Sequence, residues 1–325
     1  MRPLPPAVAA RLAAVVADPG AVPLPVFNSL LSALAPSHAH LPLHLFRRLL
    51  LPRRRPDAFT LSSLAASLLP LHASSSAAGC LHAFSLRAGL LRADPVLANS
   101  FLLLYLRAPA PPGPGLARRL FDEMPTRTAS TYNTLISHST SEGAADVVWT
   151  VVRRMVADGC APDRFTVSAA LPACTSPRQG TEMHCFALKS GMCGAGDFHV
   201  GSGLVSMYFR VGRPVLARRV FDGMEHRNVV SWTAMVGGYT ESGMFDDAVD
   251  AFRTMWMIGG VLPNRIALIS VLSAVEALTD LALGKQGYGL HGNGAEAVAL
   301  FDQMGISGYW KLLSKEILFL NDEAV

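Results

Sequence analysis

Charged residues are scarce in this sequence of 325 residues: they make up 16% of the chain, whereas hydrophobic residues make up 50%. A chain this apolar is too rich in core-forming residues to remain disordered. The net charge is only +4, and the excess lies at the N-terminus, where seven arginines and the single acid Asp18 precede Pro56. The rest of the chain is close to neutral, which argues against a uniformly basic protein that wraps duplex DNA.

Motifs for metal binding and for common kinds of catalysis are also absent. The five cysteines include no C-x-x-C pair, no histidine is followed two residues later by glutamate, and no G-x-x-x-x-G-K-[ST] phosphate loop is present. Gly-x-Gly strings such as 287–289 do not follow a strand of a βαβ unit, as a dinucleotide-binding fingerprint requires. We therefore expect no enzyme, cofactor, metal or small-molecule substrate. We expect the cysteines to be small buried apolar side chains in a reducing compartment.

A hydrophobic run suited to a membrane span is missing as well. The longest uncharged stretch, 58–86, is long enough, but Pro70 and the serine cluster at 74–76 interrupt it. A bilayer core would leave such polar groups without partners, so we expect no membrane contact. Residues 1–23 lack the continuous apolar core of a secretory signal and are poor in acids, which is compatible with an organellar targeting segment.

Internal repetition dominates the sequence. The string ARRLFDEM at 117–124 returns as ARRVFDGM at 217–224, and TYNTLI at 131–136 aligns with SWTAMV at 231–236. Two segments that share one displacement of 100 residues indicate a duplicated block. Similar boundaries recur as PDAFT, PDRFT and PNRIA, at 56–60, 162–166 and 263–267. They divide the block into units of about 31 to 36 residues, which is within the period range of helical solenoids.

Each unit is expected to form two helices. In the unit that begins near Ala129, a first amphipathic segment covers 131–140, the pair Glu142-Gly143 interrupts it, and a second segment covers 145–157. The predicted apolar face of the second segment consists of Val148, Val152, Met155 and Val156. So short a helix pair cannot bury its apolar faces alone, so neighbouring units must stack. The pattern therefore predicts an all-α repeat solenoid with essentially no β-sheet.

These strings resemble the plant pentatricopeptide repeat (PPR) proteins, in the PLS subclass that alternates standard, long and short repeats. The resemblance rests on TYNTLI opening a first helix, on A-R-R-x-F-D-x-M closing short repeats, and on VGSGLVSMY at 200–208. It extends from about Leu24 to Met304 and implies the helix-turn-helix PPR superhelix. The repeats that it implies occupy 24–57, 58–94, 95–128, 129–163, 164–197, 198–228 and 229–264, followed by partial repeats at 265–286 and 287–305.

The third cycle of repeats is incomplete. After Gln286 the chain passes directly to Gly287, in the middle of a later repeat, so about one and a half repeats are missing from the family pattern. The tail, 306–325, matches neither a repeat nor the C-terminal E/DYW extension common in the subclass. Family members that edit RNA carry a zinc deaminase domain with H-x-E and P-C-x-x-C motifs, which this chain lacks. The resemblance thus implies a truncated chain without deaminase activity.

The resemblance also implies single-stranded RNA as the partner, with one base read per repeat by two or three side chains. It points to a polar residue early in each first helix and to the last residue of the same repeat. The pairs are Asn28 with Asp57, Asn99 with Thr128, Asn133 with Asp163, Ser202 with Asn228, and Thr233 with Asn264. Family pairing rules associate Asn/Asp with uracil and Ser/Asn or Thr/Asn with adenine. The implied target is U, any base, pyrimidine, U, any base, A, A.

These residues also have structural interpretations. Asn28 and Asn133 could cap helix N-termini, and Asp57 and Asp163 follow a proline, where aspartate often forms turns. Arginine pairs recur on the second helices and invite a phosphate-binding interpretation. Their recurrence favours a solvated face on which arginine stems cover apolar surface. The pairs are at 118–119, 153–154 and 218–219.

Three functions are compatible with this sequence. The first is an RNA-binding module of the mitochondrion or chloroplast that positions RNA-editing or processing proteins on a transcript. The second is a protein-binding helical scaffold like the tetratricopeptide repeats, although their W-x-x-L-G-x-x-Y signature is absent. The third is a nonfunctional truncated product, which the missing half-cycle and the unmatched tail favour.

Overall fold

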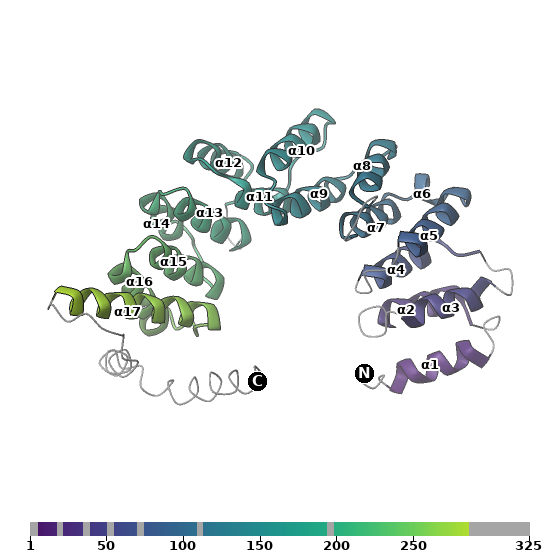
Figure 1. Ribbon diagram of the computed structural model, residues 1–325, viewed down its shortest axis with the longest axis horizontal. Coiled ribbons are helices and arrows are strands. Elements are labelled where there is room, and N and C mark those ends of the chain that lie inside the picture. The colour runs from purple at the N-terminus through teal and green to yellow at the C-terminus, as the bar shows by residue number, and fades with distance from the viewer. Residues whose placement is uncertain are drawn as a thin grey trace. The chain divides into compact units, whose positions relative to one another are not determined.

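The computed structural model describes residues 6–17, 22–34, 40–50, 55–69, 75–108, 113–193 and 198–285. Within these ranges every regular element is a helix and no strand occurs, which confirms the all-α prediction (Figure 1). The predicted break after Gln286, the partial repeat at 287–305 and the unmatched tail at 306–325 lie outside the described residues.

The chain divides into two compact units, residues 1–166 and 167–325. The helices of the first unit are α1 Pro6–Ala17, α2 Leu24–Leu34, α3 His40–Leu50, α4 Ala58–Leu68, α5 Ser75–Arg87, α6 Leu90–Ala93, α7 Pro95–Leu106, α8 Gly113–Glu123, α9 Ala129–Ser141 and α10 Ala145–Ala157. Helix α11, Arg164–Ala170, crosses the boundary. The second unit contains η2 Leu171–Ala173, α12 Pro177–Lys189, α13 Phe198–Arg210, α14 Pro214–Asp222, α15 Val229–Glu241, α16 Phe245–Arg253, η3 Thr254–Ile258 and α17 Arg265–Lys285.

Local sequence signals explain the bounds of the most regular pair, α9 and α10. Thr128 precedes α9 and forms a capping box with Thr131, which satisfies backbone N–H groups at the helix start. Gly143 has a φ of 69°, a left-handed conformation that glycine adopts without steric cost, and the chain turns there into α10. Gly243, displaced by 100 residues, has a φ of 72° between α15 and α16. The duplicated sequence therefore produces a duplicated helical hairpin.

The predicted apolar face of α10 is correct in part. Val148 and Met155 are fully buried and Val152 is half-buried. Val156, however, is 58% exposed, so its inclusion was wrong. A helix turns 100° per residue, so a position one residue beyond Met155 lies at the edge of the buried stripe and faces solvent there.

The first helix of each pair packs on the first helix of the next pair. In the first unit α2, α4, α7 and α9 contact one another in that order, and in the second unit α13, α15 and α17 do so (Figure 1). The second helices fill the space beside this row, as when α14 contacts both α13 and α15. Stacking therefore buries the apolar faces that a single pair cannot bury, for example through Phe27, Leu61 and Leu97 in the first unit.

An arginine clasp recurs where a second helix leads into the next first helix. Arg127 donates through Nε to the carbonyl of Phe121 at 2.9 Å and through Nη2 to that of Asp122 at 3.0 Å. Its guanidinium lies 4.8 Å from the centre of the Phe121 ring. Arg227 makes the same contacts, with its guanidinium 4.9 Å from the ring of Phe221. The clasp fixes the short turn that ends at Thr128 or Asn228, two of the predicted base-reading residues.

Helix α17 is longer than the helices that precede it, with 21 residues. In the earlier long repeat, Pro172 lies in the 3-10 turn η2 and Pro177 starts a separate helix, α12. The residues at the same places of the later copy are Ser273 and Leu278. Because neither lacks a backbone N–H, the helix continues through both positions.

The N-terminal segment is in part an element of the first unit. Helix α1 contacts α2 and α3, and Val15 is fully buried.

In the part of the chain that the structure describes, no helix combines the length and the apolar character needed to cross a bilayer.

None of the five cysteines, all of them described residues, forms a disulfide, but the prediction that they are buried was largely wrong. Cys174 is buried, and burial raises the pKa of its thiol to about 11. Cys80 and Cys185 are exposed, whereas Cys160 and Cys193 are half-buried. Cys80 and Cys185 lie on helices and the other three lie in the connections between helices, so position in the fold, and not the small size of the side chain, decides burial.

Candidate nucleic-acid interface

The predicted base-reading residues occupy two equivalent places in the fold. The first member of each pair is the fifth residue of a first helix: Asn28, Asn99, Asn133, Ser202 and Thr233. The second member immediately precedes the next first helix: Asp57, Thr128, Asp163, Asn228 and Asn264. Because first helices lie side by side within a unit, the structure can bring the two members of a pair into contact although about 30 residues separate them.

The pair Asn133 and Asp163 makes direct contact. The Asn133 amide donates through Nδ2 to Oδ1 of Asp163 at 3.1 Å. Its Oδ1 accepts a hydrogen bond from Oγ1 of Thr166 at 2.7 Å. Asp163 Oδ1 also accepts the backbone N–H of Thr166 at 2.8 Å. Three side chains therefore form one polar cluster between α9 and the start of α11.

The same cluster occurs at Asn28 and Asp57. Nδ2 of Asn28 lies 3.1 Å and 3.2 Å from the two carboxylate oxygens of Asp57, and Oδ1 of Asn28 accepts from Oγ1 of Thr60 at 2.7 Å. Thr60 is fully buried and Asn28 is 5% exposed. Both Asn/Asp pairs thus have one geometry, which includes a threonine that the sequence reasoning missed. The threonine is the third residue of the helix that the aspartate precedes, so the spacing Asp-x-x-Thr could have identified it.

The helix-cap interpretation of the asparagines is wrong, and the aspartates, which were expected to form turns, are the residues that cap helices. Asn28 and Asn133 are the fifth residues of α2 and α9, beyond the positions where a side chain can cap. Asp57 is the N-cap of α4 and accepts the backbone N–H of Thr60. The aspartates therefore cap one helix and contact the asparagine of the preceding first helix at the same time.

Hydrogen bonding keeps both aspartates ionised. Burial raises the pKa of the Asp163 carboxyl, but hydrogen bonds from Thr166 and Asn133 outweigh burial and hold that pKa below its ordinary value. The pKa of Asp57 is lowered against burial in the same way, by Thr60 and Asn28. At neutral pH each pair therefore presents an amide beside a carboxylate.

The pair Thr233 and Asn264 is also joined. Oγ1 of Thr233 lies 3.2 Å from Oδ1 of Asn264 and 2.6 Å from the carbonyl of Val229. Oδ1 of Asn264 accepts the backbone N–H of Ala267 at 2.9 Å, so this asparagine caps α17. A threonine is therefore accommodated at the fifth position of a first helix.

The structure does not join the remaining two pairs. Thr128 and Asn228 are engaged in capping boxes at the starts of α9 and α15. Within the described residues, Oδ1 of Asn99 and Oγ of Ser202 are buried without a hydrogen-bond partner. A buried polar atom without a partner is costly, so neither of these two side chains is stabilised in the way that the Asn/Asp pairs are.

In the second unit three of the four predicted residues line one open groove. The groove has a volume of about 630 Å³, lies over α13, α15 and α17, and is lined by Ser202, Thr233 and Asn264. Val230 and Ile266, which are 50% and 63% exposed, also line it. It therefore combines hydrogen-bonding groups with apolar side chains that are open to solvent.

Exposed apolar residues recur at the second position of the first helices, and the sequence reasoning did not name them. They are Phe59, Val96, Phe165, Val230 and Ile266. The second and fifth residues of a helix lie on one face because they are three positions apart. An apolar residue three positions before the predicted polar residue is the signal that could have found them.

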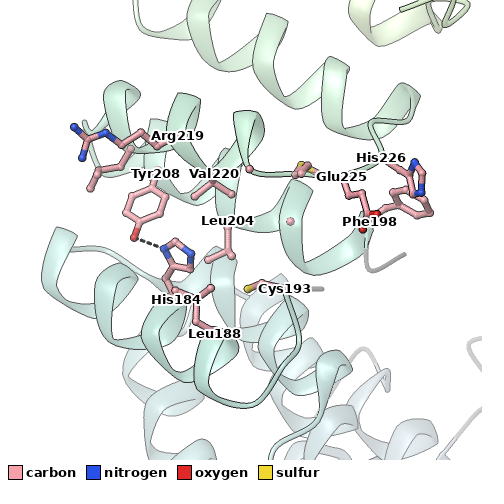
Figure 2. Close-up of a pocket in the computed structure, with 14 residues that line it drawn as sticks. His184, Leu188, Cys193, Phe198, Leu204, Tyr208, Arg219, Val220, Glu225 and His226 are labelled. Carbon is pink, nitrogen blue, oxygen red and sulfur yellow. Dashed lines mark hydrogen bonds between the residues drawn. The ribbon is translucent and has the colours of Figure 1, made fainter. Parts of the chain in front are cut away.

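A second cavity, of about 490 Å³, lies among α12, α13 and α14 and involves a histidine–tyrosine contact (Figure 2). Nδ1 of His184 is 2.9 Å from the hydroxyl of Tyr208, and burial lowers the pKa of His184. The first unit repeats this contact between His82 and Tyr105 at 2.7 Å. None of the predicted base-reading residues lines this cavity.

The described part of the chain contains no cluster of three His, Cys, Asp or Glu residues that could hold a metal ion.

The arginine pairs of the second helices lie on exposed faces, as expected. Arg154 and Arg218 are about half exposed and form ion pairs at 2.9 Å with Asp158 and Asp222, four residues further along the chain. Exposed pairs of this kind contribute little to stability.

Comparison with known proteins places the chain in a family. A family model described as PPR repeat matches residues 130–160, 202–229, 230–259 and 286–309. A chloroplastic pentatricopeptide repeat-containing protein of Arabidopsis thaliana is 34% identical over 256 residues, which cover 76% of this chain and 28% of that protein. A mitochondrial one from the same plant is 30% identical over 224 residues, covering 67% of this chain and 28% of the relative. The chain thus spans 28% of the length of each of these two curated relatives.

Solved structures show the same fold. The pentatricopeptide repeat protein PPR10 from maize aligns with a TM-score of 0.53 and 23% identity over 94% of this chain and 42% of that protein. PPR10 in complex with an 18-nt psaJ RNA element aligns with a TM-score of 0.50 and 15% identity, over 83% and 45% of the two chains. The helical repeat architecture agrees with the matches to the repeat model and with the similarity to plant relatives. This chain is therefore a pentatricopeptide repeat protein, homologous to the plant proteins of that family.

Proposed function

We propose that this chain binds single-stranded RNA sequence-specifically and acts in organellar RNA editing or processing by recruiting other factors, without catalysing a reaction itself. The observation that carries the proposal is the direct contact between the members of the predicted pairs, as in Asn133 with Asp163. The complex of PPR10 with an RNA element supports it, as do chloroplastic and mitochondrial relatives. We also propose the repeat division given above, the PLS alternation and the loss of about one and a half repeats at the junction of Gln286 and Gly287.

The Asn133 and Asp163 pair has the chemistry needed to recognise a base edge. The amide nitrogen of Asn133 carries two hydrogens, and only one is needed for the bond to Asp163. A carboxylate can accept about four hydrogen bonds, so Asp163 retains acceptor capacity. Uracil presents carbonyl oxygens on either side of an N–H, which match an amide donor beside a carboxylate acceptor.

Apolar side chains at the second helix positions would hold the base rings. In the groove of the second unit, Val230 of α15 and Ile266 of α17 come from adjacent first helices and line the same space as Thr233. A base placed between them buries both of its faces against apolar side chains while its edge reaches Thr233 and Asn264. Since single-stranded RNA exposes base edges and faces that a duplex hides, the chain should prefer the single strand.

The substitution Asn133→Thr tests the proposal. Thr233 shows that threonine fits the fifth position, so the variant should fold. It loses the amide donor, so it should bind the U-containing RNA more weakly, by about 1 kcal/mol, and shift preference at that nucleotide toward a purine. The measurement compares binding to four RNAs that differ only at the nucleotide assigned to this repeat.

The control variant is Thr150→Ala on the second helix α10, where Thr150 is exposed and bonds only within its helix through the carbonyl of Asp146. It should leave both folding and base preference unchanged. An unchanged base preference in a folded Asn133→Thr variant would contradict the assignment of Asn133 as a base-reading residue. Equal binding of the parent protein to duplex and single strand across salt concentrations would count against base readout altogether.

A further inference from the structure

We infer that Thr166 and Thr60 are positioning residues for base selection: each buried hydroxyl locks the asparagine amide of the preceding first helix into one orientation, so that its N–H face is turned to the RNA. The inference rests on the proposed function and concerns Asn133 and Asn28. It assigns a role in specificity to two residues that would not touch the base themselves.

The positions of the two threonines are equivalent. Each is the third residue of a first helix, α11 for Thr166 and α4 for Thr60, and each lies 2.7 Å from the Oδ1 atom of its asparagine. Thr60 is fully buried and Thr166 is 1% exposed. Neither hydroxyl is therefore available to a base or to bulk water.

The hydrogen-bond partners decide which way the amide faces. A threonine hydroxyl donates a single hydrogen, and Oδ1 of Asp163 already accepts the backbone N–H of Thr166 at 2.8 Å and Nδ2 of Asn133 at 3.1 Å. The hydroxyl of Thr166 lies 2.9 Å from that same carboxylate oxygen and 2.7 Å from Oδ1 of Asn133, and the hydroxyl of Thr60 lies 2.7 Å from both of its acceptors. Because Oδ1 of Asp163 already accepts two hydrogen bonds, the hydroxyl hydrogen of Thr166 is best used by Oδ1 of Asn133, the nearer acceptor. Turning the amide over would bring its oxygen against the carboxylate of Asp163 and its N–H groups against the hydroxyl of Thr166.

The locked amide has a consequence for recognition. With Oδ1 of Asn133 held by Thr166, the amide can offer a base only its remaining N–H, next to the carboxylate of Asp163. Without the Thr166 hydroxyl, Oδ1 of Asn133 would lose its buried hydrogen-bond donor. The Asn133 amide could then rotate and present its oxygen, a hydrogen-bond acceptor, to the base. The repeat would then discriminate less strictly between bases with a carbonyl and bases with an amino group at the contacted edge.

The pair Asn99 and Thr128 supplies a natural contrast. Thr131 occupies the same third position, in α9, but its hydroxyl is 3.2 Å from that of Thr128 and accepts the backbone N–H of Thr128 at 3.1 Å. Oδ1 of Asn99 has no hydrogen-bond partner among the described residues. The amide of Asn99 is therefore not locked, although the next first helix has a threonine at the same place.

The experiment uses the full chain with Thr166→Val, which keeps the shape of the side chain and removes the hydroxyl. Thr131→Val is the matched control, because both threonines accept the backbone N–H of the residue that precedes their helix. Binding is measured to four RNAs that differ at the nucleotide of the Asn133 repeat and to four that differ at the nucleotide of the Asn99 repeat. Circular dichroism establishes that each variant is folded.

Thr166→Val should reduce the preference for U at the Asn133 nucleotide about fivefold, the equivalent of one hydrogen bond at about 1 kcal/mol, and Thr166→Ser should restore it. Thr131→Val should leave the preference at the Asn99 nucleotide unchanged. If the parent protein prefers U and folded Thr166→Val keeps that preference, the inference is wrong and the proposed function stands. An equal loss of preference in Thr131→Val would assign the effect to helix capping and also overturn the inference. A parent protein without preference at either nucleotide refutes the proposed function instead.

Discussion

The close approach of α13 and α15 makes Gly238 the most demanding position in the groove of the second unit. A Cβ atom at Gly238 would lie 2.1 Å from Cδ2 of Phe209, far inside van der Waals contact. The Phe209 ring is 6% exposed and packs edge-on against Tyr239, with ring centres 5.0 Å apart. The ring therefore cannot move away without disturbing a second aromatic side chain.

The substitution Gly238→Ala should consequently destabilise the protein. Overpacking a filled site costs about 1–3 kcal/mol, and the distance of 2.1 Å places this case at the upper end. Replacing glycine by alanine in a helix interior returns about 1 kcal/mol through helix propensity. The expected net loss in the free energy of unfolding is about 2 kcal/mol.

The adjacent glycine provides the control. A Cβ at Gly237 would lie 3.6 Å from Oγ of Ser270, an ordinary contact, so Gly237→Ala should be neutral or stabilise by up to about 1 kcal/mol. Because helix propensity is the same in both variants, the difference between them, about 3 kcal/mol, measures the steric conflict alone. Urea denaturation of the two variants followed by circular dichroism gives this difference. Equal stabilities of Gly237→Ala and Gly238→Ala would refute the packing of α13 against α15 described here.

Two further predictions concern acid stability and the arginine clasp. Asp57 and Asp163 have lowered pKa values, so the stability they contribute is complete above the ordinary aspartate value of 3.8 and falls as pH drops through their folded pKa values. Thermal unfolding from pH 6 to pH 2 should therefore show a shallower acid-induced decline for Asp57→Asn with Asp163→Asn than for the parent, and parallel curves would contradict this. Arg227→Lys should lower the free energy of unfolding by about 1 kcal/mol, because an ammonium group cannot bond two carbonyls and stack on Phe221 at once. Urea denaturation checks this, and an unchanged midpoint would show that the clasp does not contribute to stability.

The sequence by itself determined the helices, because the signals for them are local. Apolar spacing and the glycine at 143 predict a second helix over 145–157, which are the bounds of α10. The duplicated strings at a displacement of 100 residues predict that the local structure is duplicated too. The arginine clasps at Arg127 and Arg227 and the left-handed glycines at 143 and 243 follow this displacement.

The resemblance of the sequence to a repeat family also named the candidate base-reading residues, but not their surroundings. That Asn133 meets Asp163, whereas Asn99 does not bond Thr128, depends on how adjacent first helices are placed against each other. The spacing Asp-x-x-Thr marks Thr166 in the sequence, but its bond to Asn133 follows only from the packing of α9 beside the start of α11, and Thr131, at the same helix position, bonds elsewhere.

Tertiary packing decided these points because the residues involved are about 30 positions apart in the chain. Helical periodicity states which face of a helix a residue occupies, but it does not state which residue of the neighbouring helix lies opposite that face. That register is set by side chains packing between helices, as Phe209 packs where Gly238 leaves room. The same packing leaves Val156 exposed against the expectation from spacing, and it leaves the hydroxyl of Ser202 buried without a partner in the groove.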